Sequence, residues 1–365
     1  MTRSKVPAKA APKKAAGQRY SYSQLAHVAL AQGGSEANVY GVIIDATFPY
    51  KVNKGKFICS LKVVDPSLNG AKADDYATIV LYANRFEDLP IVHRVGDIIR
   101  VHRAALRLYD DKRQFNVNVQ HNGSWCLFST DKAPALGGSS GENAAFAHSG
   151  KRHSFEKHEF GLLASVRKWA SGYFASHNGC PQHHHKQLNA AKGASGDFDV
   201  VAKITQLHEF DEYTNELCLR DASGESWYTL ATKLKFPHLR QGQVVRARCV
   251  QHDSSSTKQM LAQQHYSNIM TFISGSKAAK GLASVKHSFN AAALKSSGGP
   301  SSHAVVLSQV GTKFSDMPFT SLRDLFHKDN TLSGSTFRVQ LSVLAVQPGD
   351  ATKMVVTKKG AAAFW

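Results

Sequence analysis

The chain has 365 residues, 42% of them hydrophobic, which is enough for two or three domains with packed cores and excludes global disorder. Its 45 Lys and Arg residues outnumber 27 Asp and Glu residues, and the formal net charge of +18 favours a polyanionic partner, either nucleic acid or an acidic membrane surface. No apolar run approaches the roughly 18 residues of a membrane helix, and the N-terminus lacks the apolar core of a secretory signal. The five cysteines are scattered without a Cys-x-x-Cys pair, so we expect reduced thiols in a cytosolic or nuclear protein.

Residues 1–19 contain Lys and Arg but no acid, and prolines interrupt any helical period. We expect a disordered basic arm that touches phosphate or serves as a nuclear-import signal. Residues 20–132 then show β-type runs separated by turn residues, with the segment Arg85–His93 suited to a short helix between the third and fourth runs. This is the order of an OB-fold, a five-stranded Greek-key barrel. The expected strands are Val39–Asp45, Phe57–Val64, Tyr76–Tyr82, Asp97–Arg103 and Gln114–Val119.

Residues 133–153 are rich in Gly, Ser and Ala, which predicts a linker. Residues 154–194 form a helical connector, in which Leu162, Val166, Trp169 and Tyr173 fall on one helix face that packs in the core or in a partner groove.

A second OB-fold is expected over residues 195–273, because the strands and turns of this region follow the same pattern as those of the first. Its expected strands are Phe198–Leu207, Glu216–Arg220, Ser226–Ala231, Gln243–Val250 and Met260–His265. Residues 274–302 read as another linker, and residues 303–365, with strands at His303–Val310 and Thr336–Val346, as a truncated third OB-fold. The chain is therefore predicted to be mainly β, with tandem barrels, a connecting helix and a partial third β region.

Two strands carry cations on alternate positions. Arg100 and His102 share one face of the fourth strand of the first barrel, and Arg246 and Arg248 share the matching face in the second. A strand with one apolar and one cationic face suits a surface that follows a phosphate backbone, although a solvated strand face has the same pattern.

Aromatic residues near loops and strand ends are interleaved with basic ones in both barrels. Unpaired bases expose flat faces that stack on such rings at roughly 1–3 kcal/mol each, whereas a duplex hides them. For some of these rings core packing is an equal reading, and Tyr50 and Tyr109 are expected to be exposed because they adjoin polar turns. The second barrel repeats the mixture with Tyr213, Tyr228, Lys233, Lys235, His265 and Tyr266.

Asp211 lies in an acidic, aromatic loop of the second barrel. A carboxylate can accept hydrogen bonds from the N1–H and N2–H₂ edge of guanine, so Asp211 either reads guanine or is a solvated loop acid.

No metal, cofactor or catalytic group is predicted. The run from Cys180 to His185 contains three adjacent histidines, but neighbouring side chains point apart and no second ligand pair completes a zinc site. The sequence also lacks phosphate-loop, zinc-protease, nucleophile-elbow and deaminase motifs, so we expect a protein that is not an enzyme.

Long stretches of the chain resemble the alpha subunit of the ciliate telomere end-binding protein, within the wider protection-of-telomeres OB-fold family. The resemblance covers about residues 18–346. Its longest matches are Gly41–Lys51, Tyr76–Tyr82, Arg85–Ile91, Gly96–Ala104, Gly196–Ile204, Asp211–Leu217 and Lys233–His238.

This resemblance implies two OB-folds that clamp a thymine- and guanine-rich 3′ overhang of single-stranded telomeric DNA in the nucleus. It places the stacking positions at Tyr50, Phe57, Tyr109 and Tyr228, and further contacts at Lys51, Lys62, Gln114, His265 and Tyr266.

Two departures from the family pattern stand out. Gln120-His121 replaces two adjacent aromatics, which removes one stacking platform and leaves His121 as the weaker one. The third OB-fold, which in the family docks a beta subunit, is cut short, so binding of that subunit is in doubt.

The main hypothesis is capping of the single-stranded chromosome end, with no membrane partner. The alternatives are a general single-strand binder in replication and, from a different class, an enzyme or a tRNA-binding accessory module.

Overall fold

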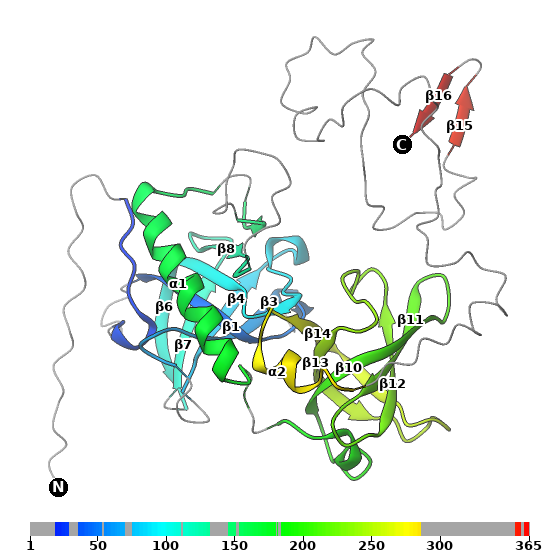
Figure 1. The fold of residues 1–365 in the computed structure, drawn as a ribbon. Helices are drawn as coiled ribbons and strands as arrows, with labels where there is room; N and C mark the ends of the chain where they lie inside the picture. Colours follow the sequence, from blue (N-terminus) through cyan, green and yellow to red (C-terminus); the bar gives the residue numbers. More distant parts are fainter. Residues whose placement is uncertain are drawn as a thin grey trace, which may run out of the picture. The chain divides into compact units, whose positions relative to one another are not determined.

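A computed structural model describes residues 19–28, 36–52, 55–69, 75–110, 112–131, 145–150, 153–179, 181 and 184–285, and two strands near the C-terminus (Figure 1). The C-terminal strands, β15 (Val355–Lys358) and β16 (Ala361–Phe364), form a hairpin in a compact unit separate from the one that holds both barrels. The basic arm up to residue 18 and the third-region strands His303–Val310 and Thr336–Val346 lie outside the described residues.

The first predicted barrel is confirmed as a closed sheet in the OB-fold order. Its strands pair in the order β1-β3-β4-β7-β6, and β6 pairs back to β1 to close the barrel. The pairing of β4 with β7 is parallel and the other barrel pairs are antiparallel. The elements are η1 (Leu25–His27), β1 (Glu36–Ala46), β2 (Tyr50–Lys51), β3 (Phe57–Val64), β4 (Ala77–Ala83), η2 (Phe86–Asp88), β5 (Arg94–Val95), β6 (Ile98–Tyr109), β7 (Lys112–Asn118), β8 (Ser124–Phe128) and β9 (Ala147–His148).

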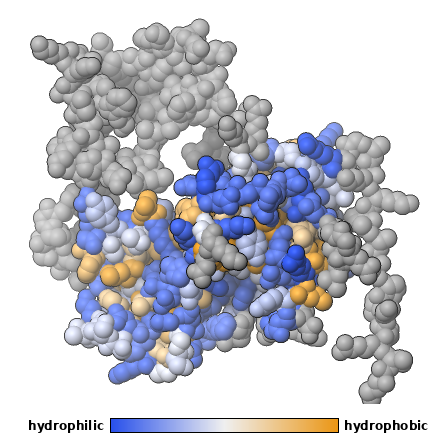
Figure 2. All heavy atoms as spheres, turned by 180° about the vertical axis from the view of Figure 1, so that it is seen from behind, coloured by the Kyte–Doolittle hydropathy of each residue, from blue (hydrophilic) through white to orange (hydrophobic). Residues whose placement is uncertain are grey.

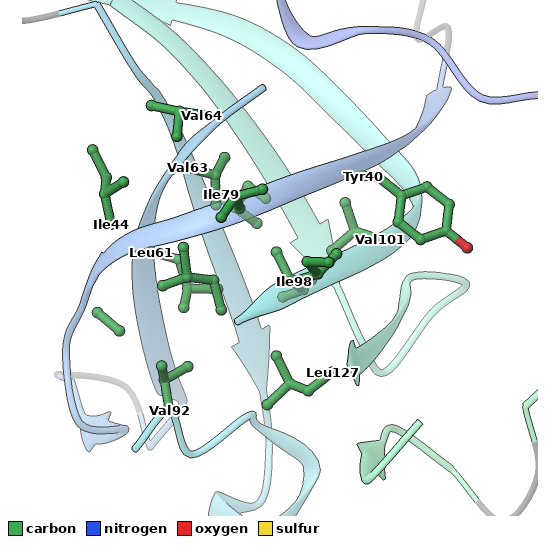
Figure 3. Packing of buried hydrophobic residues seen from close by; sticks show 14 of the residues in the cluster. Tyr40, Ile44, Leu61, Val63, Val64, Ile79, Val92, Ile98, Val101 and Leu127 are labelled. Carbon is green, nitrogen blue, oxygen red and sulfur yellow. The ribbon is translucent and has the colours of Figure 1, made fainter. Parts of the chain in front are cut away.

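Apolar side chains on alternate strand positions fill this barrel. Leu61, Ile79 and Ile98 come from three different strands, are fully buried and meet in the interior (Figure 3). In β7, buried Phe115 and Val117 alternate with half-buried amides, which is the period of two expected for a strand with one face inward.

Two details of the first barrel differ from the sequence prediction. The expected helix at Arg85–His93 is reduced to the single 3-10 turn η2, because Leu89 precedes Pro90 and the residue before a proline avoids helical geometry. The fourth strand continues past Arg103 to Tyr109, and Arg103 itself adopts a left-handed backbone with φ of 56° beside a register shift in β1.

The second barrel repeats the same order. Strands β12-β11-β10-β13-β14 are neighbours, and a parallel bridge from Tyr228 to Met260 links β12 to the start of β14. Its elements, with the preceding connector and following helix, are α1 (Lys157–Ser176), η3 (Leu188–Ala190), β10 (Phe198–Glu209), β11 (Thr214–Arg220), β12 (Ser226–Thr232), β13 (Val244–His252), β14 (Leu261–Phe272) and α2 (Lys277–Gly281).

Helix α1 confirms the predicted connector helix but buries a different stripe. A capping box formed by Glu156 and Glu159 begins the helix. The buried side chains are Glu159, Leu163, Val166, Ala170 and Phe174, so of the predicted stripe only Val166 is fully inside. Trp169 and Tyr173 flank the stripe, where their rings stack on each other with centroids 5.1 Å apart.

The two barrels share one sheet edge. Strand β5 of the first barrel pairs in parallel with the end of β14, with Arg94 opposite Thr271 and Val95 opposite Phe272. Both predicted linkers also contribute structure, because β9 pairs with β8 and α2 packs near α1. The barrels are therefore held together over a wider contact than a flexible tether provides.

Candidate nucleic-acid interface

Aromatic rings from both barrels meet at the junction. The ring of Tyr50, in β2, lies 5.2 Å from that of His265 and 5.6 Å from that of Tyr266, both in β14 (centroid distances). The Tyr266 hydroxyl donates to Asp197 at 2.6 Å, and this hydrogen bond raises the pKa of Tyr266 to about 12. We call Tyr50, His265 and Tyr266 the inter-barrel aromatic cluster. The fold thus brings together three predicted site residues that are far apart in the sequence.

A second set of rings lies on the loops next to this cluster. The Lys235 ammonium sits 4.5 Å from the centroid of the Phe48 ring, and burial lowers the pKa of Lys235 to about 8. Phe48 also contacts Phe86, which in turn meets Phe57 at 6.1 Å. Lys51 is exposed and pairs with Phe57 across β2 and β3. The sequence pattern places Phe48 among the aromatic residues that precede Tyr50, but Phe48 was not among the predicted binding residues.

The prediction that Arg246 and Arg248 face a phosphate backbone is wrong in its geometry. Arg246 is 1% exposed and bonds to Asp199 at 2.5 Å and to the Ile44 carbonyl of the first barrel at 3.0 Å. The Arg248 Nε lies 2.8 Å from Asp45 of the first barrel. The cationic strand face is therefore turned toward the other barrel, where a partner carboxylate offsets the cost of burying charge.

Asp45 is the centre of this ionic junction. It is 2% exposed and lies near three cations, Arg246, Arg248 and Lys62 of β3. Burial alone would raise the pKa of Asp45, but the two guanidinium groups and Lys62 hold it well below its usual value. The signal in the sequence was a lone acid inside the apolar run of β1.

Asn268 and Tyr266 add neutral contacts across the same junction. The Asn268 amide donates to the carbonyls of Ala46 and Val92, and the Phe48 backbone N–H donates to the Tyr266 carbonyl at 3.1 Å. Together with the ionic contacts, these bonds fix where the inter-barrel aromatic cluster sits.

Arg100 and His102 are also buried, so this face of β6 is not the open surface along a phosphate backbone that the sequence predicted. Arg100 donates to Glu159 of α1 at 2.6 Å, and the hydroxyls of Tyr22 and Tyr40 each donate to the same carboxylate at 2.7 Å. Burial lowers the pKa of His102 to about 3, so its ring is neutral at pH 7. The physical reason is that α1 and the segment before β1 cover this strand and supply the carboxylate.

Arg100 and His102 nevertheless line a cavity of about 390 Å³. Its wall also contains cations and hydroxyls, and the Tyr20 ring stacks on His102 with centroids 4.1 Å apart. The remaining polar lining residues are Arg19, Arg103, Ser124, Ser149, His153 and Ser154. This lining suits an anionic group such as a phosphate.

The outer surface of the first barrel carries the other predicted residues of that domain. Tyr109, at the tip of the β6–β7 hairpin, is 72% exposed, as its position beside a polar turn predicted. Lys62 lies 5.0 Å from the Tyr76 ring centroid, which is a cation–π contact. Gln114 is half-buried in β7 and His121 is exposed just after it.

In the second barrel, the predicted residues cluster around the β10–β11 hairpin. Tyr213 is 58% exposed, and its backbone N–H donates to the Asp211 carboxylate at 2.8 Å, so Asp211 stabilises its own turn. Lys233 reaches the Asp211 carbonyl at 3.0 Å and forms an ion pair with Glu209. Tyr228 lies apart from this hairpin, with the Lys258 ammonium 5.1 Å from its ring centroid.

The face of the molecule seen in Figure 2 is mostly hydrophilic, with separate apolar patches. Within the described residues, no group of three or more His, Cys, Asp or Glu side chains could hold a metal ion, and no helix is both long and apolar enough to cross a membrane. Of the candidate metal run, Cys180, Gln182 and His183 lie outside the described residues.

Two family patterns match the chain. "Telomeric single stranded DNA binding POT1/CDC13" matches residues 16–180, and "Telomere end-binding protein alpha subunit OB2 domain" matches residues 185–284.

Two ciliate proteins are similar over nearly the whole chain, and a mouse protein over less than half of it. Telomere-binding protein subunit alpha of Stylonychia mytilus is 52% identical over 96% of this chain and 74% of its own length. The protein of the same name from Sterkiella nova is 49% identical over 95% of this chain and 73% of its own length. Mouse protection of telomeres protein 1 is 29% identical over 43% of this chain and 22% of its own length. Since the two family matches fall on the two barrels and the ciliate similarity spans both, the chain belongs to the family of telomere-binding protein alpha subunits.

Proposed function

We propose that this protein binds the single-stranded, guanine-rich 3′ overhang of telomeres and protects the chromosome end, in the nucleus and without catalysis. The observation that carries the proposal is the inter-barrel aromatic cluster, in which rings from two barrels meet, with Lys235 over the ring of Phe48, two residues before Tyr50. Exposed rings with nearby cations bind unpaired bases and their phosphates, whereas paired bases in a duplex offer no free ring faces.

The proposed contact residues extend from this cluster along both barrels. Tyr109 and Tyr213 offer exposed rings at the hairpin tips, and Lys51 and Lys62 offer cations on the first barrel. The cavity lined by Arg100, His102 and Arg103 would take a phosphate group. Phe57, Gln114, His121, Asp211, Tyr228, Lys233, His265 and Tyr266 complete the proposed surface. Arg246 and Arg248 have the role of holding the barrels in place.

A partner subunit is a separate proposal. The relatives are named subunit alpha, which is the name of one member of a complex. The region predicted to dock such a partner, 303–365, lies largely outside the described residues. We propose that a second subunit binds the chain through this region. Purification of the chain with and without residues 303–365 tests this, because only the longer form should carry a second subunit with it.

The experiment that tests DNA binding is a titration of the full chain with a fluorescent thymine- and guanine-rich single strand. A scrambled strand and a duplex of the same length serve as competitors, at several salt concentrations. We expect the single strand to bind more tightly than the duplex. The logarithm of its binding constant should fall against the logarithm of the salt concentration with a slope of about −0.7 per neutralised phosphate. Equal affinity for the scrambled strand would favour a general role in replication, and equal affinity for the duplex would overturn the proposal.

A further inference from the structure

A second cavity, separate from the inter-barrel aromatic cluster, lies on the outer face of the first barrel. It has a volume of about 370 Å³ and is formed where β4, β6 and β7 run side by side. Side chains on its wall include Tyr82, Arg107, Asn116, Asn118 and His121. The two asparagines lie two positions apart in β7, so their side chains project from the same face of the sheet.

Hydrogen bonds within the barrel determine which end of each amide is free. The Asn118 Oδ1 accepts from the Gln120 backbone N–H at 3.2 Å. A backbone nitrogen can only donate, so the bonded atom of Asn118 is its oxygen and its NH₂ group remains for a ligand.

Asn116 is oriented in the same sense. Its Oδ1 accepts from the Tyr82 hydroxyl at 3.2 Å and from Gln114 Nε2 at 3.0 Å. Two donors occupy the two lone pairs of this oxygen, so Asn116 also offers its NH₂ group. Arg107 is exposed on the neighbouring strand and makes no ion pair with any residue that the structure describes. The cavity therefore presents three groups that donate hydrogen bonds.

A cavity that offers only hydrogen-bond donors favours a base edge that carries only acceptors. Guanine carries two adjacent acceptors, O6 and N7, on one edge, whereas adenine pairs N7 with an N6–H₂ donor and cytosine carries an N4–H₂ donor. Thymine has the single acceptor O4 on that edge. Glu36, the carboxylate on the cavity rim, is exposed and disfavours a phosphate there. The matching occupant is a base. Unpaired cytosine also carries two adjacent acceptors, O2 and N3, on its other edge, but the proposed strand is rich in thymine and guanine, so guanine is the base that fits.

We propose that this cavity is a guanine subsite, in which Arg107, Asn116 and Asn118 donate to O6 and N7 of one unpaired guanine. The inference rests on the proposed single-strand function and adds to it the base and the edge that is read. Tyr82 acts as a positioning residue, because its hydroxyl holds the Asn116 oxygen away from the ligand.

The test uses the full chain and a thymine- and guanine-rich single strand in lithium buffer, which keeps such a strand from folding on itself. Each guanine in turn is replaced by 7-deazaguanine, which lacks the N7 acceptor, or by hypoxanthine, which keeps O6 and N7 and lacks only the N2 amino group. At one position we expect 7-deazaguanine to weaken binding about 5- to 150-fold, the range of one good bidentate contact. Hypoxanthine at that position should bind like guanine.

The variants Asn118→Ala and Arg107→Met supply the second arm. Each should weaken binding of the unmodified strand and reduce the 7-deazaguanine penalty at that one position. Asn178→Ala, which removes an exposed amide just beyond α1, is the matched control and should retain the full penalty.

The outcomes separate the two proposals. If the unmodified single strand binds no better than a duplex, the proposed function itself fails. If that strand binds well but hypoxanthine and 7-deazaguanine weaken binding equally, or the penalty is unchanged in both cavity variants, only the guanine subsite is overturned.

Discussion

The two barrels carry the same pattern of cations on their fourth strands but bury them against different partners. In the first barrel Arg100 turns toward Glu159 of helix α1, and in the second Arg246 and Arg248 turn toward Asp45 and Ile44 of the first barrel. In both cases a long basic side chain attaches the barrel to an element outside it. These repeated basic positions therefore join each barrel to a neighbouring part of the fold, and the cations left for a ligand lie elsewhere, including Arg107 farther along β6.

The largest expected effect on the free energy of unfolding comes from removing the Glu159 carboxylate, which pairs with Arg100 of the first barrel. Glu159 is fully buried and accepts from Arg100, Tyr22, Tyr40 and the Glu156 backbone, which together keep its pKa low although burial would raise it. Glu159→Ala leaves a buried guanidinium without its partner. We expect the free energy of unfolding to fall by about 3–5 kcal/mol in urea denaturation. Glu87→Ala, at an exposed site in η2, is the control and should change it by about 0.5 kcal/mol or less.

Breaking the corresponding contact of the second barrel should cost slightly less. Arg246→Met removes the bonds to Asp199 and Ile44, but Arg248 and Lys62 remain beside Asp45. We expect a loss of about 3 kcal/mol. Hydrogen exchange should accelerate at the Thr271 and Ile273 amides, which donate to His93 and Val95 across the junction.

The control for this comparison is Arg240→Met, at an exposed site of the second barrel. It should leave the junction amides protected. If Arg246→Met destabilises the protein without faster exchange at those two amides, Arg246 acts only within its own barrel.

A third prediction concerns pH. The folded protein holds the pKa of His102 at about 3 because the ring is buried, and the value in the unfolded chain is near 6.5. Below pH 6.5 His102 binds a proton in the unfolded chain but stays neutral in the folded protein. The contribution of His102 to the free energy of unfolding is therefore fully present above pH 6.5 and is lost as the pH falls toward 3. At pH 5 this loss amounts to about 2 kcal/mol.

The measurement is the free energy of unfolding of the protein and of His102→Asn between pH 7.5 and about 4.5. The slope against pH should be smaller in the variant by up to one proton. Parallel curves for the two proteins would mean that His102 takes up its proton at the same pH in the folded and the unfolded states. His238 of the second barrel, whose pKa burial likewise lowers to about 3, provides the matching comparison through His238→Asn.

The smallest effect on stability is expected at the exposed hairpin tips, where only binding should change. Tyr109→Ala should weaken single-strand binding by roughly 1–3 kcal/mol and leave the salt slope nearly unchanged, because a ring stacks without neutralising phosphate. Lys51→Met, at an exposed site in β2, should in contrast reduce that slope. A changed slope with nearly unchanged affinity in Tyr109→Ala would rule out a stacking role.

Comparison of the barrels also shows where sequence reasoning succeeded. Strand β3 was predicted with its observed bounds, and the closed barrel order followed from strands separated by turn residues. The exposure of Tyr109 followed from its polar turn, since a ring at a hairpin tip has no neighbours to cover it. The helix expected at Arg85–His93 was wrong because Pro90 restricts the residue before it.

The sequence by itself determined the main strands of both barrels and the connecting helix, because alternation of apolar residues and turn chemistry act over a few neighbouring residues. It also placed aromatic and basic residues in both barrels. Only the tertiary structure decided that Arg100 and Arg246 are buried while Tyr50, His265 and Tyr266 converge. The reason is that a basic side chain can be buried only where a carboxylate from a distant segment lies within hydrogen-bonding distance. No local sequence pattern specifies that distance.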